Sequence, residues 1–312
     1  MRTQMLTTIK DSIVACMATY PDRFDVLERS ARSISGQLDH LFIYVNETLD
    51  GFPDLTSLKN VTILNGAEHE GNISANGKVY PLNLLSNCLV FTIDDDFIYP
   101  SNYVSKIKFI FKICKNNCCV AVHGSILPPE LEWYFDRTHV FAARDSLLRA
   151  ELVNLAGSGT FAFHQSTLNT NFSDFQPDVQ VDLIFSSLAR QRGLPIWSPS
   201  RPKDWLIPLR PDGLMQDMKK EVTYHTYEAR KLDWSFSVYR DIATKALQKN
   251  GRPMSEIYSD LNLSQALISA LGTGRTPANW QTSRKNFLAR RNYLRLLSPK
   301  GPTSHNEYGS QI

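Results

Sequence analysis

The sequence predicts an α/β protein in which a mixed, Rossmann-like sheet is flanked by helices. Residues 12–19, 41–45 and 60–64 are short apolar runs rich in β-forming side chains, as in buried strands. Apolar residues at helical spacing over 24–34 separate the first two runs. A fourth apolar run, 88–93, leads into three consecutive aspartates at 94–96. This β-α-β-β order before a further strand is typical of a nucleotide-binding half-domain.

The bulk composition is that of an ordinary globular protein. The chain has 312 residues, 42% hydrophobic and 21% charged, enough for one large domain or one domain with an appendage. A net charge of +3 is too small to favour nucleic acid as a partner. No apolar run approaches the roughly 18 residues of a membrane span, and residues 1–10 lack the apolar core of a signal peptide. The five cysteines show no zinc-site spacing, so we expect a cytoplasmic protein.

The acidic turn formed by Asp94, Asp95 and Asp96 is the most informative stretch. Ligands of open α/β sheets bind at the carboxyl ends of the strands, where this turn falls. Adjacent carboxylates repel one another unless a cation or hydrogen-bond donors offset the repulsion, and Mg²⁺ or Mn²⁺ with a phosphate ligand suits such oxygens. An extended backbone would point Asp94 and Asp96 one way and Asp95 the other. The alternative is a solvated acidic turn or a helix N-cap.

The segment from Ile93 through Asp94-Asp95-Asp96 to Ile98-Tyr99-Pro100 resembles the DxD segment of GT-A-fold, family-2-like glycosyltransferases. The resemblance is closest to bacterial enzymes that build capsular or surface polysaccharides. It implies that Asp94 lies near the ribose and uracil of a nucleotide sugar and contributes to the metal site. It also implies that Asp96 holds the Mn²⁺ or Mg²⁺ that bridges the diphosphate, with Asp95 supporting donor binding.

Three further segments match the order expected of such enzymes on the donor side. Thr19-Tyr20-Pro21-Asp22-Arg23 follows the first strand, and Arg23 either contacts a donor phosphate or starts the next helix with a surface ion pair. Asn46 ends the second strand. Lys78 lies in a glycine-bracketed loop and opens a helical run towards Leu85. The resemblance places Thr19, Tyr20, Arg23, Asn46 and Lys78 near the nucleotide, whereas Lys78 alternatively caps an ordinary loop.

The second half of the chain supplies candidates for the acceptor side. Gly157-Ser158-Gly159 precedes a strand over 160–163, and paired glycines let the backbone approach a ligand. Asp182 starts a helix that ends near Gly193, where the resemblance implies the base that deprotonates the acceptor hydroxyl. Val181 departs from the usual acidic neighbour, and a helix-capping Asp182 is the alternative. Asp178 is the fallback base.

The sequence leaves alternatives for the roles of two histidines and of the C-terminal region. His123, at the end of a strand over 119–122, is either an acceptor-site or metal-adjacent residue or a structural histidine. The resemblance also implies a late metal ligand, which His225 can supply. We expect a catalytic domain over 1–205, with its nucleotide half at about 12–100 and its acceptor half over 101–205. A mainly helical extension over 206–298 and a disordered tail over 299–312 follow. A basic helix over 284–297 either packs on its own domain or contacts the inner face of an anionic membrane.

The order of these segments predicts a metal-dependent, hexosyltransferase-type enzyme. It would transfer a sugar, by default from a UDP-sugar, to a saccharide or glycolipid hydroxyl with inversion. A nucleotidyltransferase is one alternative, but the chain lacks an early glycine-rich loop with basic residues for a triphosphate. A non-catalytic saccharide-binding or scaffold subunit is another, and the aromatic residues within 128–145 would serve it.

Overall fold

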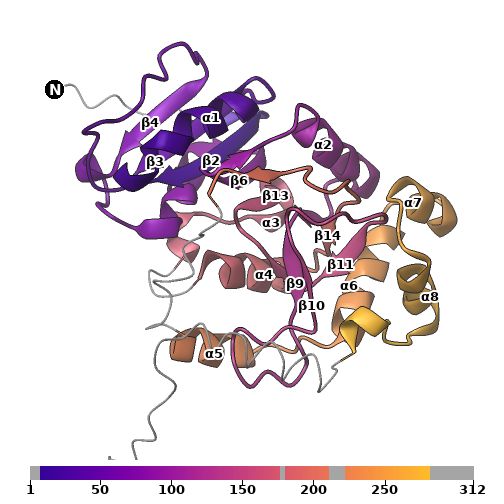
Figure 1. Ribbon diagram of the computed structural model, residues 1–312. Coiled ribbons are helices and arrows are strands. Elements are labelled where there is room, and N and C mark those ends of the chain that lie inside the picture. The colour runs from indigo at the N-terminus through magenta and orange to yellow at the C-terminus, as the bar shows by residue number, and fades with distance from the viewer. Residues whose placement is uncertain (1–7, 176–179, 211–221, 282–312) are drawn as a thin grey trace, which may run out of the picture.

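A computed structural model describes residues 8–175, 180–210 and 222–281 of the chain. Within these ranges the main feature is a mixed sheet of eight strands with helices packed on it (Figure 1), which confirms the predicted α/β architecture. Along the sheet its strands are β11 (Glu151–Val153), β14 (Ile196–Ser198), β8 (Cys119–Ala121), β13 (Thr160–His164), β6 (Leu89–Asp94), β2 (Ile13–Thr19), β3 (His40–Val45) and β4 (Val61–Asn65).

Strand direction brings many of the predicted site residues to one edge of this sheet. Strands β6, β2, β3 and β4 are parallel, and β13 runs antiparallel between β6 and β8. The start of β13 therefore lies beside the carboxyl ends of β6 and β8. The nearly continuous burial of β2 and β6 explains why both read as uninterrupted apolar runs.

The helices beside the sheet agree with the predicted spacing. Helix α1 (Phe24–Ser35) buries Phe24, Leu27, Ala31 and Ile34, the predicted apolar face. Helix α2 (Tyr103–Cys114) buries Ile107, Ile110, Phe111 and Cys114, which recur at helical spacing, and α4 (Val181–Gln191) covers the second half of the sheet. The short helical segments are η1 (Pro21–Arg23), η2 (Gly66–Glu68), α3 (Gln165–Leu168) and η5 (Phe172–Asp174).

The helical run predicted from Lys78 is wrong in detail. The chain forms two separate 3₁₀ turns, η3 (Ser74–Lys78) and η4 (Tyr80–Leu84). Pro81 lies in the first positions of the second turn, and its ring nitrogen has no hydrogen to continue a helix from the first. Lys78 therefore ends a turn instead of opening a helix.

Several short strands were not predicted, because they are two or three residues long and lack a period. A small sheet combines β10 (His139–Phe141), β9 (Gly124–Ile126) and β12 (Leu155–Ala156). Two further pairs join β1 (Ile9–Lys10) to β5 (Leu85–Ser86) and β15 (Ile207–Pro208) to β7 (Phe97–Ile98). Of the last pair, β7 comes directly after the acidic turn in the chain.

The described C-terminal part is helical, as expected for much of 206–298. It contains α5 (Val222–Arg230), α6 (Phe236–Gln248), α7 (Met254–Asp260), α8 (Gln265–Thr273) and η8 (Ala278–Trp280). The predicted basic helix over 284–297 and the predicted tail over 299–312 lie outside the described residues. None of the helices described here combines the length and the apolar character needed to cross a bilayer.

Candidate functional site

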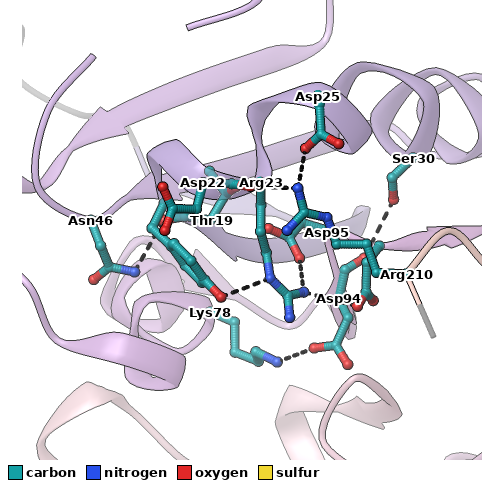
Figure 2. A network of polar contacts seen from close by, with 12 residues as sticks. Thr19, Asp22, Arg23, Asp25, Ser30, Asn46, Lys78, Asp94, Asp95 and Arg210 are labelled. Atoms are coloured by element: carbon teal, nitrogen blue, oxygen red, sulfur yellow. Dashed lines mark hydrogen bonds and ion pairs between the residues drawn. The ribbon is translucent and has the colours of Figure 1, made fainter. Parts of the chain in front are cut away.

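Two positively charged side chains of the protein form ion pairs with the acidic turn. Lys78, from η3, forms an ion pair with Asp94 at the end of β6. Arg23, from η1, donates from one Nη1 atom to Asp95 Oδ1 at 2.8 Å and to Asp96 Oδ2 at 2.9 Å (Figure 2). Three carboxylates thus face two positive charges, and both cationic side chains are only 7% exposed. Part of the repulsion expected within the triplet is offset from inside the fold.

The predicted alternation along the triplet is wrong, since the strand ends at Asp94. Asp95 and Asp96 lie in a turn and both accept hydrogen bonds from Arg23. The surface ion pair considered for Arg23 is also wrong, because its partners are buried aspartates from a distant part of the chain. A contact between Arg23 and a donor phosphate stays a prediction.

Three carboxylates against two cationic side chains leave negative charge in excess at the turn, and the pKa values of the carboxyl groups are shifted by burial and by their neighbours. Burial and the neighbouring Asp94 raise the pKa of Asp96 to about 6, although Arg23 opposes the rise. Burial also raises the pKa of Asp95. Desolvation acts in the same direction on Asp94, but the Lys78 ammonium outweighs it and holds the pKa of Asp94 below its ordinary value. The turn is therefore suited to one additional cation.

A divalent metal ion fits this turn only with help from a ligand. Among the residues that the structure describes, no group of three or more His, Cys, Asp or Glu side chains could hold a metal by itself. Mg²⁺ commonly takes one or two carboxylates and completes its shell with phosphate oxygens and water. Asp94 and Asp96 supply two carboxylates from one turn, which is the number that such a site uses.

His225 lies apart from the acidic turn. It belongs to α5, and its ring packs against Tyr134 with 5.5 Å between centroids. Figure 1 shows α5 on the other side of α4 from β6. The predicted set of Asp94, Asp96 and His225 is thus not assembled in the described structure, and sequence spacing alone held no information on where α5 would pack.

Asp182 binds the glycine turn between β12 and β13. Its Oδ1 accepts a hydrogen bond of 2.7 Å from the Ser158 backbone N–H. Asp182 lies in the first turn of α4, but the N-cap residue is Gln180, so the capping interpretation of Asp182 does not hold. Its role as a base stays a prediction. Asp178, the fallback base, lies outside the described residues.

Gly157 and Gly159 allow two site residues to approach the same turn. A Cβ atom on Gly159 would lie 1.8 Å from Asp94 Oδ2, and one on Gly157 would lie 1.6 Å from His123 Nε2. The His123 Nδ1 is 2.9 Å from the Thr160 hydroxyl, which fixes the ring. Burial lowers the pKa of His123, and Asp182 and Asp94 oppose this shift. His123, left open by its position after β8, thus joins Asp94 and Asp182 around residues 157–159.

Asn46 and Thr19 connect the strand ends to the loop that carries Lys78. The Asn46 amide donates to the carbonyl oxygens of Thr19 and Ser74 at 3.1 and 3.2 Å, and its Oδ1 accepts from Ile73 N–H at 2.9 Å. These bonds use both the amide nitrogen and the amide oxygen of Asn46, so this side chain holds the loop against the strand end. A direct contact of Asn46 or Thr19 with a nucleotide stays a prediction.

Tyr20 and a later segment complete the surroundings of Arg23. The Tyr20 hydroxyl accepts a hydrogen bond of 2.9 Å from Arg23 Nε. Leu209 donates its N–H to the Asp96 carbonyl oxygen at 2.6 Å, and Arg210 binds Asp25 across the same edge (Figure 2). Sequence reasoning missed Leu209 and Arg210 because nothing local signals that β15 returns to β7. A separate hollow of about 570 Å³ lies at the opposite edge, beside Ile13 and His164, away from these residues.

Replacing Gly159 with alanine should disturb the site by a purely steric route. The added methyl group would overlap the Asp94 carboxylate, and overpacking of this kind costs about 1–3 kcal/mol. Gly272→Ala is the matched control, because a Cβ atom there meets nothing within 4 Å in helix α8. Urea unfolding should show a loss for Gly159→Ala and no loss for Gly272→Ala. Equal stability of Gly159→Ala and the parent chain would contradict the packing described.

Asp96 should make the folded protein less stable as the pH rises. Since its folded pKa is raised to about 6, the folded state binds more protons than the unfolded state below that pH. Stability from this group is therefore present near pH 4 and lost as the pH rises through about 6. Asp96→Asn removes the effect, so the difference in melting temperature, variant minus parent, should be more positive at about pH 7.5 than at about pH 4.5. A constant difference, or one of opposite slope, would refute the assignment.

The sequence matches no protein-family model and no curated protein. Among solved structures, the fold is similar to residues 1–349 of TarS from S. aureus, with a TM-score of 0.43 and 10% identity. The match covers 85% of this chain and 72% of that chain. Similarity at this level bears on neither family nor activity, so the case for function depends on the site itself.

Proposed function

We propose that the chain is a metal-dependent glycosyltransferase that moves a sugar from a nucleotide diphosphate donor to a saccharide hydroxyl. The observation that carries this proposal is the arrangement around residues 157–159. Gly159 leaves space for Asp94, and the neighbouring Ser158 N–H binds Asp182. One turn of backbone therefore separates a carboxylate suited to the donor from a carboxylate suited to the acceptor.

The donor half of the mechanism depends on the acidic turn. Asp96 and Asp94 would hold Mn²⁺ or Mg²⁺, which when bound neutralises charge on the leaving diphosphate. Arg23 and Lys78 hold these carboxylates through ion pairs from two other segments. Because Arg23 and Asp96 are both buried, the Asp96 carboxylate is positioned before a ligand arrives.

The acceptor half depends on Asp182. The Ser158 N–H orients its carboxylate, which accepts the proton of the acceptor hydroxyl as that oxygen attacks C1 of the donor sugar. The new bond joins the acceptor oxygen to C1, and the bond from C1 to the diphosphate oxygen breaks on the opposite face. The proton ends on Asp182, the electron pair leaves with the diphosphate, and the anomeric centre inverts.

The finer assignments depend on the DxD resemblance around Asp94–Asp96. It supports a family-2-like enzyme with a UDP-hexose as donor. The same resemblance supports a saccharide or glycolipid of a bacterial surface polysaccharide, such as a capsule, as acceptor. A cytoplasmic site of action is part of this proposal, because nucleotide sugars are the donors it requires.

Calorimetric titration of UDP, GDP, CDP and CMP, each with Mn²⁺ and with EDTA, tests the donor site. One nucleotide should bind only when Mn²⁺ is present. Asp96→Asn should weaken that binding by at least about tenfold, the lower range seen when groups at a metal site are lost. The matched control is Asp260→Asn, whose carboxylate pairs with Arg252 on the surface, and it should bind as the parent does.

Two results would contradict the donor site. The first is the absence of binding for all four nucleotides. The second is binding of equal strength in EDTA and in Asp96→Asn, because the acidic turn would then have no part in it.

A further inference from the structure

The loop between β9 and β10 carries a cluster of aromatic rings, Trp133, Tyr134 and Phe135. The ring centroids of Trp133 and Phe135 are 4.9 Å apart, and those of Tyr134 and Phe135 are 5.4 Å apart. Tyr134 is buried, whereas Trp133 and Phe135 remain partly exposed. The cluster therefore has a buried base and an outer edge of two rings that solvent reaches.

Hydrogen bonds within the loop fix the backbone that carries the two outer rings. The Trp133 N–H donates to the buried Asp136 Oδ2 at 2.7 Å, and the Asp136 N–H donates to the Trp133 carbonyl oxygen at 2.8 Å. This closed turn holds the backbone on both sides of Tyr134 and Phe135. Rings on such a turn are pre-organised, so little conformational entropy would be lost when a ligand stacks on them.

Helix α5 holds the same loop from outside. Thr226 Oγ1 accepts a hydrogen bond of 3.0 Å from the Tyr134 N–H, and Arg230 Nε donates to the Leu131 carbonyl oxygen at 2.9 Å. His225, the predicted metal ligand, packs on the Tyr134 ring. In the described structure His225 thus contacts the aromatic loop and not the acidic turn.

The aromatic loop lies on the acceptor side of the proposed site. It belongs to the sheet of β9, β10 and β12, and β12 leads directly into the turn that binds Asp182. In Figure 1 the loop reaches α5 beyond α4, away from the donor edge at β6. Burial raises the pKa of Tyr134, and the Asp182 carboxylate adds to this rise.

We propose that Trp133 and Phe135 form a stacking platform for a pyranose ring of the saccharide acceptor, an inference that rests on the proposed transferase function. One face of a pyranose presents C–H groups, which gain from burial against an aromatic face while the ring hydroxyls stay in water. The platform would hold a sugar unit next to the one whose hydroxyl meets Asp182. The negative face of an aromatic ring suits a neutral sugar better than an anionic group.

Saccharide binding to the full chain tests the platform by saturation-transfer NMR. The probes are the methyl glycosides of glucose, galactose and N-acetylglucosamine. For the glycoside that binds the parent best, Trp133→Ala should raise Kd by about tenfold, the loss that a well-packed aromatic contact typically gives. Trp133→Leu keeps apolar volume but removes the flat face, so it should also weaken binding. Phe109→Ala, which removes an aromatic ring 53% exposed on α2, should leave Kd unchanged.

Titration of the same variants with UDP and Mn²⁺ separates this inference from the function on which it rests. Weaker saccharide binding in both Trp133 variants with nucleotide affinity within about twofold of the parent supports the platform. An unchanged saccharide Kd in Trp133→Ala, or no binding of any glycoside by the parent, overturns it while nucleotide binding still stands. Saccharide binding through Trp133 without any nucleotide binding overturns the transferase function and leaves the platform in place.

Discussion

The structure depends on the ion pairs between the acidic turn and two cations from other segments. Arg23 joins η1 to Asp95 and Asp96, and Lys78 joins η3 to Asp94. Removing one partner of a buried pair costs about 3–5 kcal/mol, because the other charge stays buried and unpaired. These contacts fix the ends of β2 and β6 and the loop after β4 to one another. The same contacts fix the positions of the three carboxylates.

The glycine turn at residues 157–159 extends this arrangement to the second half of the chain. Antiparallel β13 starts where β6 and β8 end, so its preceding turn meets Asp94 and His123. The turn also donates a backbone hydrogen bond to Asp182 at the start of α4. A sheet of mixed direction thereby places Asp94, His123 and Asp182 around one short turn, which a purely parallel sheet would not do in this way.

The sequence was most informative where structure is local. The ranges of β2, β3, β6 and α2 follow from apolar runs and helical spacing, and the acidic turn was recognisable from composition alone. Contacts over long separations were not predictable. The partners of Arg23, the return of Leu209 to Asp96 and the packing of His225 on Tyr134 depend on tertiary structure. The division of neighbouring aromatic residues into buried Tyr134 and partly exposed Trp133 also had no sequence signal, since the loop has no period.

The central claim is that the acidic turn holds one divalent cation through Asp94 and Asp96 beside two built-in cations. The anomalous scattering of manganese, measured from a crystal of the protein grown with Mn²⁺ and UDP, tests it most directly. The account predicts a single peak about 2.1 Å from an Asp96 oxygen, a distance typical of hard cations, with diphosphate oxygens in the same shell. A peak away from the acidic turn, or a diphosphate bound there by Arg23 and Lys78 without manganese, would contradict it.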